Sequence, residues 1–223
     1  MTLLPVGSAN NVARSLGFQD DDPGRLVRGW STARILACDI GAMSFGDTEC
    51  RFVESAGGGV FADALVRAEN GEHDLARQEK IEQGLRLLQE SIAAARRAPW
   101  ALSLDGSDFS TELIGFEAMN VRDVGPRVPL APEANPGDRM LDVVLIRGTD
   151  ATALEAYVDA RLARRSSEPP TLQTVRAREI VFRPPPTTPL HWDDEILTEN
   201  GPDDTVTVRV LAPVQLLMTD AGS

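Results

Sequence analysis

The sequence predicts an α+β protein, a mainly antiparallel β-sandwich with one long packed helix, preceded by a short strand–helix unit. Three observations support this prediction. Residues 75–97 repeat apolar side chains at helical spacing. Segments typical of strands outnumber helices after residue 100. Residues 2–16 have the pattern of a strand, a turn and a helix, a unit that cannot bury both of its faces alone and normally belongs to an α/β sheet.

The elements before residue 100 follow from apolar runs and turn signals. A short apolar run at 2–6 predicts a strand, and the turn at 7–10 can cap the helix that Gly17 ends. The glycine run 57–59 is expected to break a strand ahead of a helix. The expected elements are a strand at 2–6, helices at 11–16 and 25–30, strands at 32–44 and 50–56, and helices at 60–68 and 75–97.

The second half is predicted to be mostly strand. Asp105 and Gly106 form a hairpin signal, 126–137 is a proline-rich loop, and the prolines at 184–186 separate two strands. The expected elements are strands at 100–104, 112–121 and 141–147, a helix at 151–164, strands at 171–182 and 188–192, and two strands within 205–218.

Composition excludes several classes of protein. The 223 residues carry a formal net charge of −12 and are 42% hydrophobic, so a core of ordinary size can form. An acidic chain argues against an electrostatic nucleic-acid binder. The sequence has no apolar run near the ~20 residues that span a bilayer, and its first residues lack the pattern of a signal peptide. A cytoplasmic protein is therefore expected.

Scarce residues exclude further chemistry. Lys80 is the single lysine, and no glycine-rich phosphate loop precedes it. Two histidines cannot make a three-histidine zinc site, and two cysteines are too few for a disulfide framework. The G-x-S-x-G motif of serine hydrolases is absent.

Four segments, in order, resemble the diacylglycerol kinase-like lipid kinases, a family that includes sphingosine and ceramide kinases. Residues 4–17, LPVGSANNVARSLG, are similar to "PLGTxNDxAR". Residues 54–64, ESAGGGVFADA, resemble "N-x-AGxGFDA", and 130–144, LAPEANPGDRMLDVV, resemble "LAPxAxxDDGxLDVV". Residues 191–195, HWDDE, stand where the family has "DGE". The resemblance implies a lipid-kinase fold over nearly the whole chain.

The sequence also departs from the family pattern. The family's nucleotide-binding half begins upstream of "PLGTxN" and carries a "GGDGT" loop, which this sequence lacks. We therefore expect a truncated homologue. Single positions differ too, and the lost glycines change the backbone freedom at both acidic segments. Ser8 stands for Thr, Asn11 for Asp, Glu54 for Asn, and Arg139 and Asp194 for glycines.

The turn at Gly7, Ser8 and Asn10 is the implied ATP contact. Free backbone N–H groups at the start of a helix suit a phosphate. On local chemistry alone, the same residues describe a plain capping turn. Lys80 lies far from this turn in the sequence and is not expected to replace the missing loop.

The implied magnesium site is the Asp138 carboxylate with the backbone carbonyls of Asn135 and Met140. Oxygen ligands with several waters are what magnesium prefers. The alternative is a solvated aspartate in a Pro-Gly turn.

The implied catalytic residue is Glu195, supported by Asp193. Transfer of a phosphoryl group to a lipid hydroxyl needs a carboxylate that accepts the hydroxyl proton. By themselves, however, three acidic residues in a row more often mark a solvated strand end.

Two functions remain open. The first is an ATP- and magnesium-dependent lipid kinase homologue acting on a diacylglycerol-like or sphingoid lipid during transient visits to a membrane surface, inactive without the nucleotide loop. The second is a non-catalytic β-sandwich that binds a lipid or small ligand. We expect residues 1–30 to be a remnant of the nucleotide-binding domain, with 214–223 returning to it, and 31–213 to be the β-rich domain. An exposed sheet edge at the start would favour a homodimer.

Overall fold

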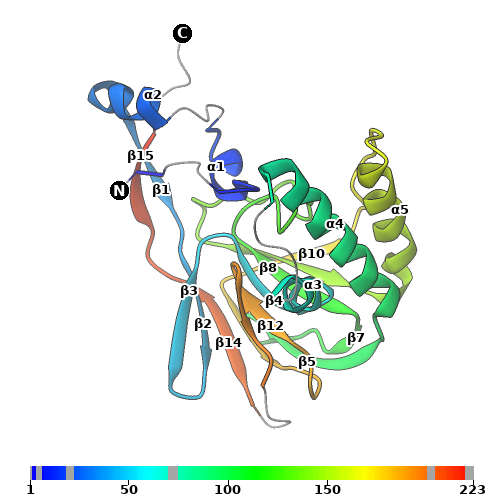
Figure 1. The fold of residues 1–223 in the computed structure, drawn as a ribbon. Coiled ribbons are helices and arrows are strands. Elements are labelled where there is room, and N and C mark those ends of the chain that lie inside the picture. The colour runs from blue at the N-terminus through cyan, green and yellow to red at the C-terminus, as the bar shows by residue number, and fades with distance from the viewer. Residues whose placement is uncertain (1, 4–6, 19–22, 70–74, 200–203, 219–223) are drawn as a thin grey trace.

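Two antiparallel sheets form the body of the protein (Figure 1). The structure is a computed structural model that describes residues 2–3, 7–18, 23–69, 75–199 and 204–218. One sheet runs in the order β10-β9-β8-β4-β12-β13, and the other runs β3-β2-β14-β11-β5-β6, with β7 paired to β5. The strands of the first sheet are β10 (Gln173–Ala177), β9 (Leu141–Ile146), β8 (Gly115–Met119), β4 (Ser55–Gly59), β12 (Leu190–Trp192) and β13 (Glu195–Leu197). Those of the second are β3 (Thr48–Phe52), β2 (Gly41–Phe45), β14 (Val206–Val210), β11 (Glu179–Arg183), β5 (Ala98–Leu104), β6 (Ser107–Asp108) and β7 (Thr111–Leu113).

The first core lies between the two sheets. Trp100 of β5 and Phe182 of β11 pack against Phe116 of β8, with ring centroids of Phe116 and Phe182 4.8 Å apart. All three rings are buried, and each such ring removes a large apolar area from water. The predicted β-sandwich is confirmed.

Three helices, α3 (Val60–Glu69), α4 (Arg77–Ala94) and α5 (Ala151–Leu162), cover the outer face of the first sheet (Figure 1). The four apolar positions of the predicted long helix are all buried there: Ile81, Leu85, Leu88 and Ile92. The long packed helix is therefore confirmed, although it is shorter at both ends than expected. None of the described helices is long and apolar enough to cross a membrane.

The two strands expected at 32–44 and 50–56 are in fact four, and the glycine run does not break a strand. Gly57 and Gly59 lie inside β4, which pairs with β8 and β12. A Cβ on Gly57 would lie 2.2 Å from the Phe116 carbonyl oxygen, and Gly59 has a φ of 90°. Glycine is needed because a neighbouring backbone comes this close.

An arm extends from the body (Figure 1). It comprises α1 (Asn11–Ser15), α2 (Pro23–Arg28), a 3₁₀ turn (Gly29–Thr32), and β1 (Arg34–Cys38) paired antiparallel with β15 (Val214–Met218). Thr2 forms a parallel bridge with Leu217, so the start of the chain lies beside the strand at 214–218, as expected. Of the strand expected at 2–6, residues 4–6 lie outside the described part. A separate small core joins these elements, made of Ala13, Leu16, Phe18, Cys38, Leu216 and Met218.

Candidate lipid and phosphate site

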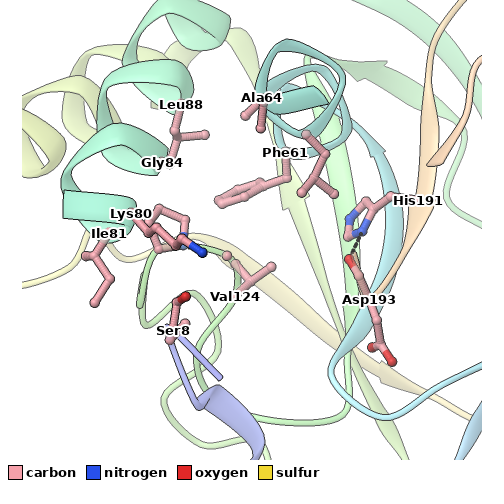
Figure 2. A pocket seen from close by; sticks show the side chains of 15 residues that line it. Ser8, Phe61, Ala64, Lys80, Ile81, Gly84, Leu88, Val124, His191 and Asp193 are labelled. Carbon is pink, nitrogen blue, oxygen red and sulfur yellow. Dashed lines mark hydrogen bonds between the residues drawn. The ribbon is translucent and has the colours of Figure 1, made fainter. Parts of the chain in front are cut away.

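An apolar pocket of about 190 Å³ lies between α3 and α4 (Figure 2). Small side chains at Ala64, Ala68 and Gly84 leave the space open where the two helices face each other. Its walls also include the turn at 8–9, the loop at 124–126, and two residues of the β12–β13 hairpin. The pocket therefore brings together five separate parts of the sequence.

The predicted phosphate turn forms one rim of this pocket. Ser8 lines the pocket, and the backbone carbonyl of Ser8 accepts a hydrogen bond from Arg77 Nε at 2.9 Å. Arg127 Nε donates to the Ala9 carbonyl at 2.9 Å. The following helix, α1, has five residues and begins after Asn10, whose φ is 54° and whose side chain does not cap it. Such a short helix adds little dipole, so the turn alone does not make an ATP site.

Asp193 is the predicted catalytic residue that the fold brings to the pocket (Figure 2). It occupies the two-residue turn between β12 and β13 with a φ of 51°. Its carboxylate accepts backbone N–H groups from Val53 at 3.0 Å, Glu54 at 2.7 Å and Ser55 at 3.4 Å. Burial raises the pKa of Asp193, although these hydrogen bonds act in the opposite direction. The carboxylate is thus occupied by backbone donors.

Glu195 lies elsewhere. It begins β13, its side chain is exposed, and it is not among the residues that line the pocket. Its charge reaches Cys50 of β3: burial, and then the Glu195 carboxylate, raises the pKa of that thiol. Asp193 and Glu195, two acidic residues of one motif, therefore have different surroundings.

A buried pair beneath the hairpin was not predicted. His191 Nε2 lies 2.9 Å from both carboxylate oxygens of Glu117, and Nδ1 lies 3.1 Å from the Asp193 carbonyl oxygen. Because both ring nitrogens face acceptors, the geometry fits an imidazolium ring. Burial lowers the pKa of His191, but Glu117 and the Asp193 carbonyl outweigh it, so the pKa lies above its ordinary value. The sequence feature that could have indicated this buried pair is a single glutamate, Glu117, within the otherwise apolar run 115–119.

Two departures from the lipid-kinase pattern contact each other. Asn11 Nδ2 donates to Glu54 Oε1 at 3.0 Å, and the backbone N–H of Gly125, on the pocket wall, donates to the same oxygen at 2.9 Å. Burial raises the pKa of Glu54 to about 7, against the effect of these donors. The pattern has an aspartate at the position of Asn11 and an asparagine at the position of Glu54. In this chain the amide and the carboxylate have therefore exchanged positions. One negative charge is retained at the contact.

The predicted magnesium ligands are engaged with partners inside the protein. The Asp138 carboxylate binds the Arg176 guanidinium through one oxygen and accepts the Met140 N–H at 3.0 Å through the other. The Asn135 carbonyl accepts the Asp138 N–H at 3.4 Å. Within the described residues, no group of three or more His, Cys, Asp or Glu side chains could hold a metal. We therefore assign no step to magnesium.

Arg139, which replaces a glycine of the pattern, takes up the left-handed backbone with a φ of 64°. Its N–H donates to Asp39 Oδ2 at 2.6 Å, and its Nε lies 3.7 Å from Asp39 Oδ1. Asp39 is fully buried, and burial raises the pKa of its carboxyl. Arginine side chains, from Arg139 and Arg176, thus supply the positive charge in this acidic loop.

The sandwich, the arm and the helix-covered sheet together make a mixed α/β fold with antiparallel sheets. Specifically, the chain is similar to a diacylglycerol kinase from Bacillus anthracis str. Sterne, with a TM-score of 0.69, 16% identity, and coverage of 99% of this chain and 69% of that one. Two further structures from this organism, assigned to the same class, give TM-scores of 0.71 and 0.68 at 16% and 17% identity, and this chain covers 70% and 68% of them. No family model and no curated protein matches the sequence. The predicted resemblance is confirmed at the level of the fold.

Proposed function

We propose that this protein is a lipid-kinase homologue whose described residues supply the lipid side of the reaction. The reaction would transfer the γ-phosphate of ATP to a hydroxyl of a diacylglycerol-like or sphingoid lipid. One observation supports this most strongly. Ser8 and Asp193 come from two separate motif segments, and both line the same apolar pocket. An acyl chain can be buried there while its polar end stays at the rim.

The residues have distinct roles in this proposal. Phe61, Leu65 and Leu88 take up the acyl chain and exclude water. The Ser8 hydroxyl donates to a phosphate or lipid oxygen at the rim. Because backbone N–H groups occupy the Asp193 carboxylate, Asp193 holds the hairpin in place at the pocket wall. ATP supplies the phosphoryl group, and the residues present do not form a complete site for it.

The experiment is to measure ATP binding and lipid phosphorylation by residues 1–223. We expect no phosphorylation, and ATP binding no tighter than about millimolar, or ~4 kcal/mol, because a single turn offers few N–H donors. Lipid binding should persist. Submicromolar ATP binding would contradict the proposal by revealing a nucleotide site that the motifs do not describe.

A non-catalytic lipid-binding protein is the second candidate. The observation that favours it is that backbone N–H groups already engage the Asp193 carboxylate, and that Glu195 is not among the residues that line the pocket. A chimera that adds the part of the Bacillus anthracis kinase not covered by this chain separates the two functions. Phosphorylated lipid favours the kinase homologue, and lipid binding without product favours the second candidate.

A further inference from the structure

The pocket between α3 and α4 has two different polar ends. Figure 2 shows the Lys80 side chain on the same side as Ser8, with His191 and Asp193 on the opposite side and Phe61 between them. At the second end, His191 and Glu117 neutralise each other as a buried pair. At the first end, Lys80 brings a positive charge to an otherwise apolar lining.

Lys80 lies on the wall of the pocket. It is the single lysine of the sequence, and it makes no ion pair with any residue that the structure describes. The helix offers it none, because positions 76, 77, 83 and 84 are Ala, Arg, Gln and Gly. A lysine stem lies well along apolar surface while the ammonium group reaches a polar partner.

The rim around Lys80 adds further positive charge. Arg77 and Arg127 donate to the carbonyls of Ser8 and Ala9, and Arg161 donates to the Arg127 carbonyl at 2.8 Å. The chain as a whole carries a formal charge of −12, whereas Lys80 and the three arginine side chains at this rim are positively charged.

The size of the pocket limits what can enter. Its volume of about 190 Å³ is below the roughly 300–1,000 Å³ of sites that enclose a drug-sized ligand. Such a space encloses part of one acyl chain and leaves no room for two chains side by side.

We propose that this pocket binds a single-chain amphiphile with an anionic head group, a carboxylate or a phosphate, which pairs with Lys80 while the acyl chain lies against Phe61, Leu65 and Leu88. The inference rests on the proposed function, because it takes the pocket as the lipid site, and it replaces the two-chain or sphingoid lipid named there with a single-chain anionic lipid. A sphingoid amine is disfavoured, since its ammonium group would face the Lys80 ammonium. The end at Asp193 does not compete for the head group, because its carboxylate repels anions.

The test is displacement of the fluorescent fatty acid cis-parinaric acid, measured without ATP. The competitors are palmitate, palmitoyl lysophosphatidate, monopalmitoylglycerol and sphingosine, which separate carboxylate, phosphate, neutral and cationic head groups. The variants are Lys80→Gln, the charge-retaining Lys80→Arg, and Arg86→Gln, which removes the same charge from an exposed site on α4 outside the pocket.

We expect Lys80→Gln to weaken the binding of the two anionic lipids by about threefold to tenfold, a range typical of a partly exposed charge pair. It should leave the neutral lipid unchanged and bring sphingosine closer to it. Lys80→Arg and Arg86→Gln should match the wild type, and high salt should reduce the anionic preference. Equal loss for neutral and anionic lipids, no loss, or a wild-type preference for sphingosine overturns the inference.

Ala64→Phe fills the pocket and should abolish displacement of the probe, provided that its thermal unfolding remains cooperative. If the chain binds no lipid at all, both this inference and the proposed function fail. If anionic lipids bind through Lys80 but the chimera makes no product, only the kinase assignment fails.

Discussion

The loop at Asp138–Arg139 and the turn at Asp193–Asp194 each place an acidic residue beside a position where the lipid-kinase pattern has glycine. In the loop, Arg139 itself adopts the left-handed backbone. In the turn, the left-handed residue is Asp193, one position before the lost glycine. The loop is neutralised by arginines, whereas the turn is satisfied by three backbone N–H groups. The backbone can thus accommodate the loss of a glycine in two ways. In both, the neighbouring carboxylate, of Asp138 or Asp193, interacts with groups of the same chain.

The largest effect is expected in the turn. Asp193→Ala removes the acceptor of three N–H groups near the protein interior, and each unsatisfied donor carries a desolvation cost. We expect a loss of ~2–4 kcal/mol in the free energy of unfolding, measured by urea denaturation. Because the Asp138 pair is more exposed, Asp138→Ala should lower the free energy of unfolding by less. A smaller loss for Asp193→Ala than for Asp138→Ala would contradict this prediction.

The next effect concerns Glu54, whose N–H is one of the donors to Asp193. In the folded chain its pKa lies at about 7, against 4.5 ordinarily. The folded state therefore binds more protons between these values, and this group's contribution to stability falls as the pH rises from about 4.5 to 7. Glu54→Gln should remove that loss, up to ~3 kcal/mol. Urea unfolding of both proteins at pH 5 and pH 8 checks it, and parallel pH dependences would contradict it.

The loop at Asp138 should bind magnesium when the Arg176 side chain is removed. We expect flat calorimetric titrations with magnesium for the wild type and for Asp138→Asn. Arg176→Ala frees the Asp138 carboxylate and should allow weak, about millimolar binding. Its stability should change by less than ~1 kcal/mol, since both side chains are partly exposed. Magnesium binding by the wild type would show that the arginines do not block the site.

The smallest effect is expected at Asp194. Its side chain is exposed and its backbone is not left-handed, so Asp194→Ala should alter stability by no more than ~0.5 kcal/mol. A larger change would mean that the turn depends on both residues, which urea denaturation of the double variant with Asp193→Asn would measure.

Much of the fold could be predicted because its signals are local. The apolar period of α4 and the Asp105-Gly106 hairpin each depend on a few neighbouring residues. β4 could not be predicted in this way. Gly57 and Gly59 have the pattern of a break, and only the close approach of β8 and β12 explains why they lie within a strand.

The sequence motifs predicted individual residues of the candidate site, but they did not predict which of these residues lie together. The sequence identified Ser8 and Asp193 separately, but nothing in it placed both on one pocket with Lys80. Nor could it show that backbone N–H groups would occupy the Asp193 carboxylate, because those donors come from 53–55. Pairing of this kind depends on how distant strands align.

The pairing of β1 with β15 affects the timing of folding during synthesis. Cys38 lies opposite Val214, so the early strand has no partner until residue 214 has been made. At ribosomal speeds of about 5–20 residues per second, that wait is roughly ten to forty seconds. During it, Leu36 and the apolar face of α1 are left without Leu216 to cover them. The arm is therefore the part of the nascent chain with the longest exposure to chaperones and proteases.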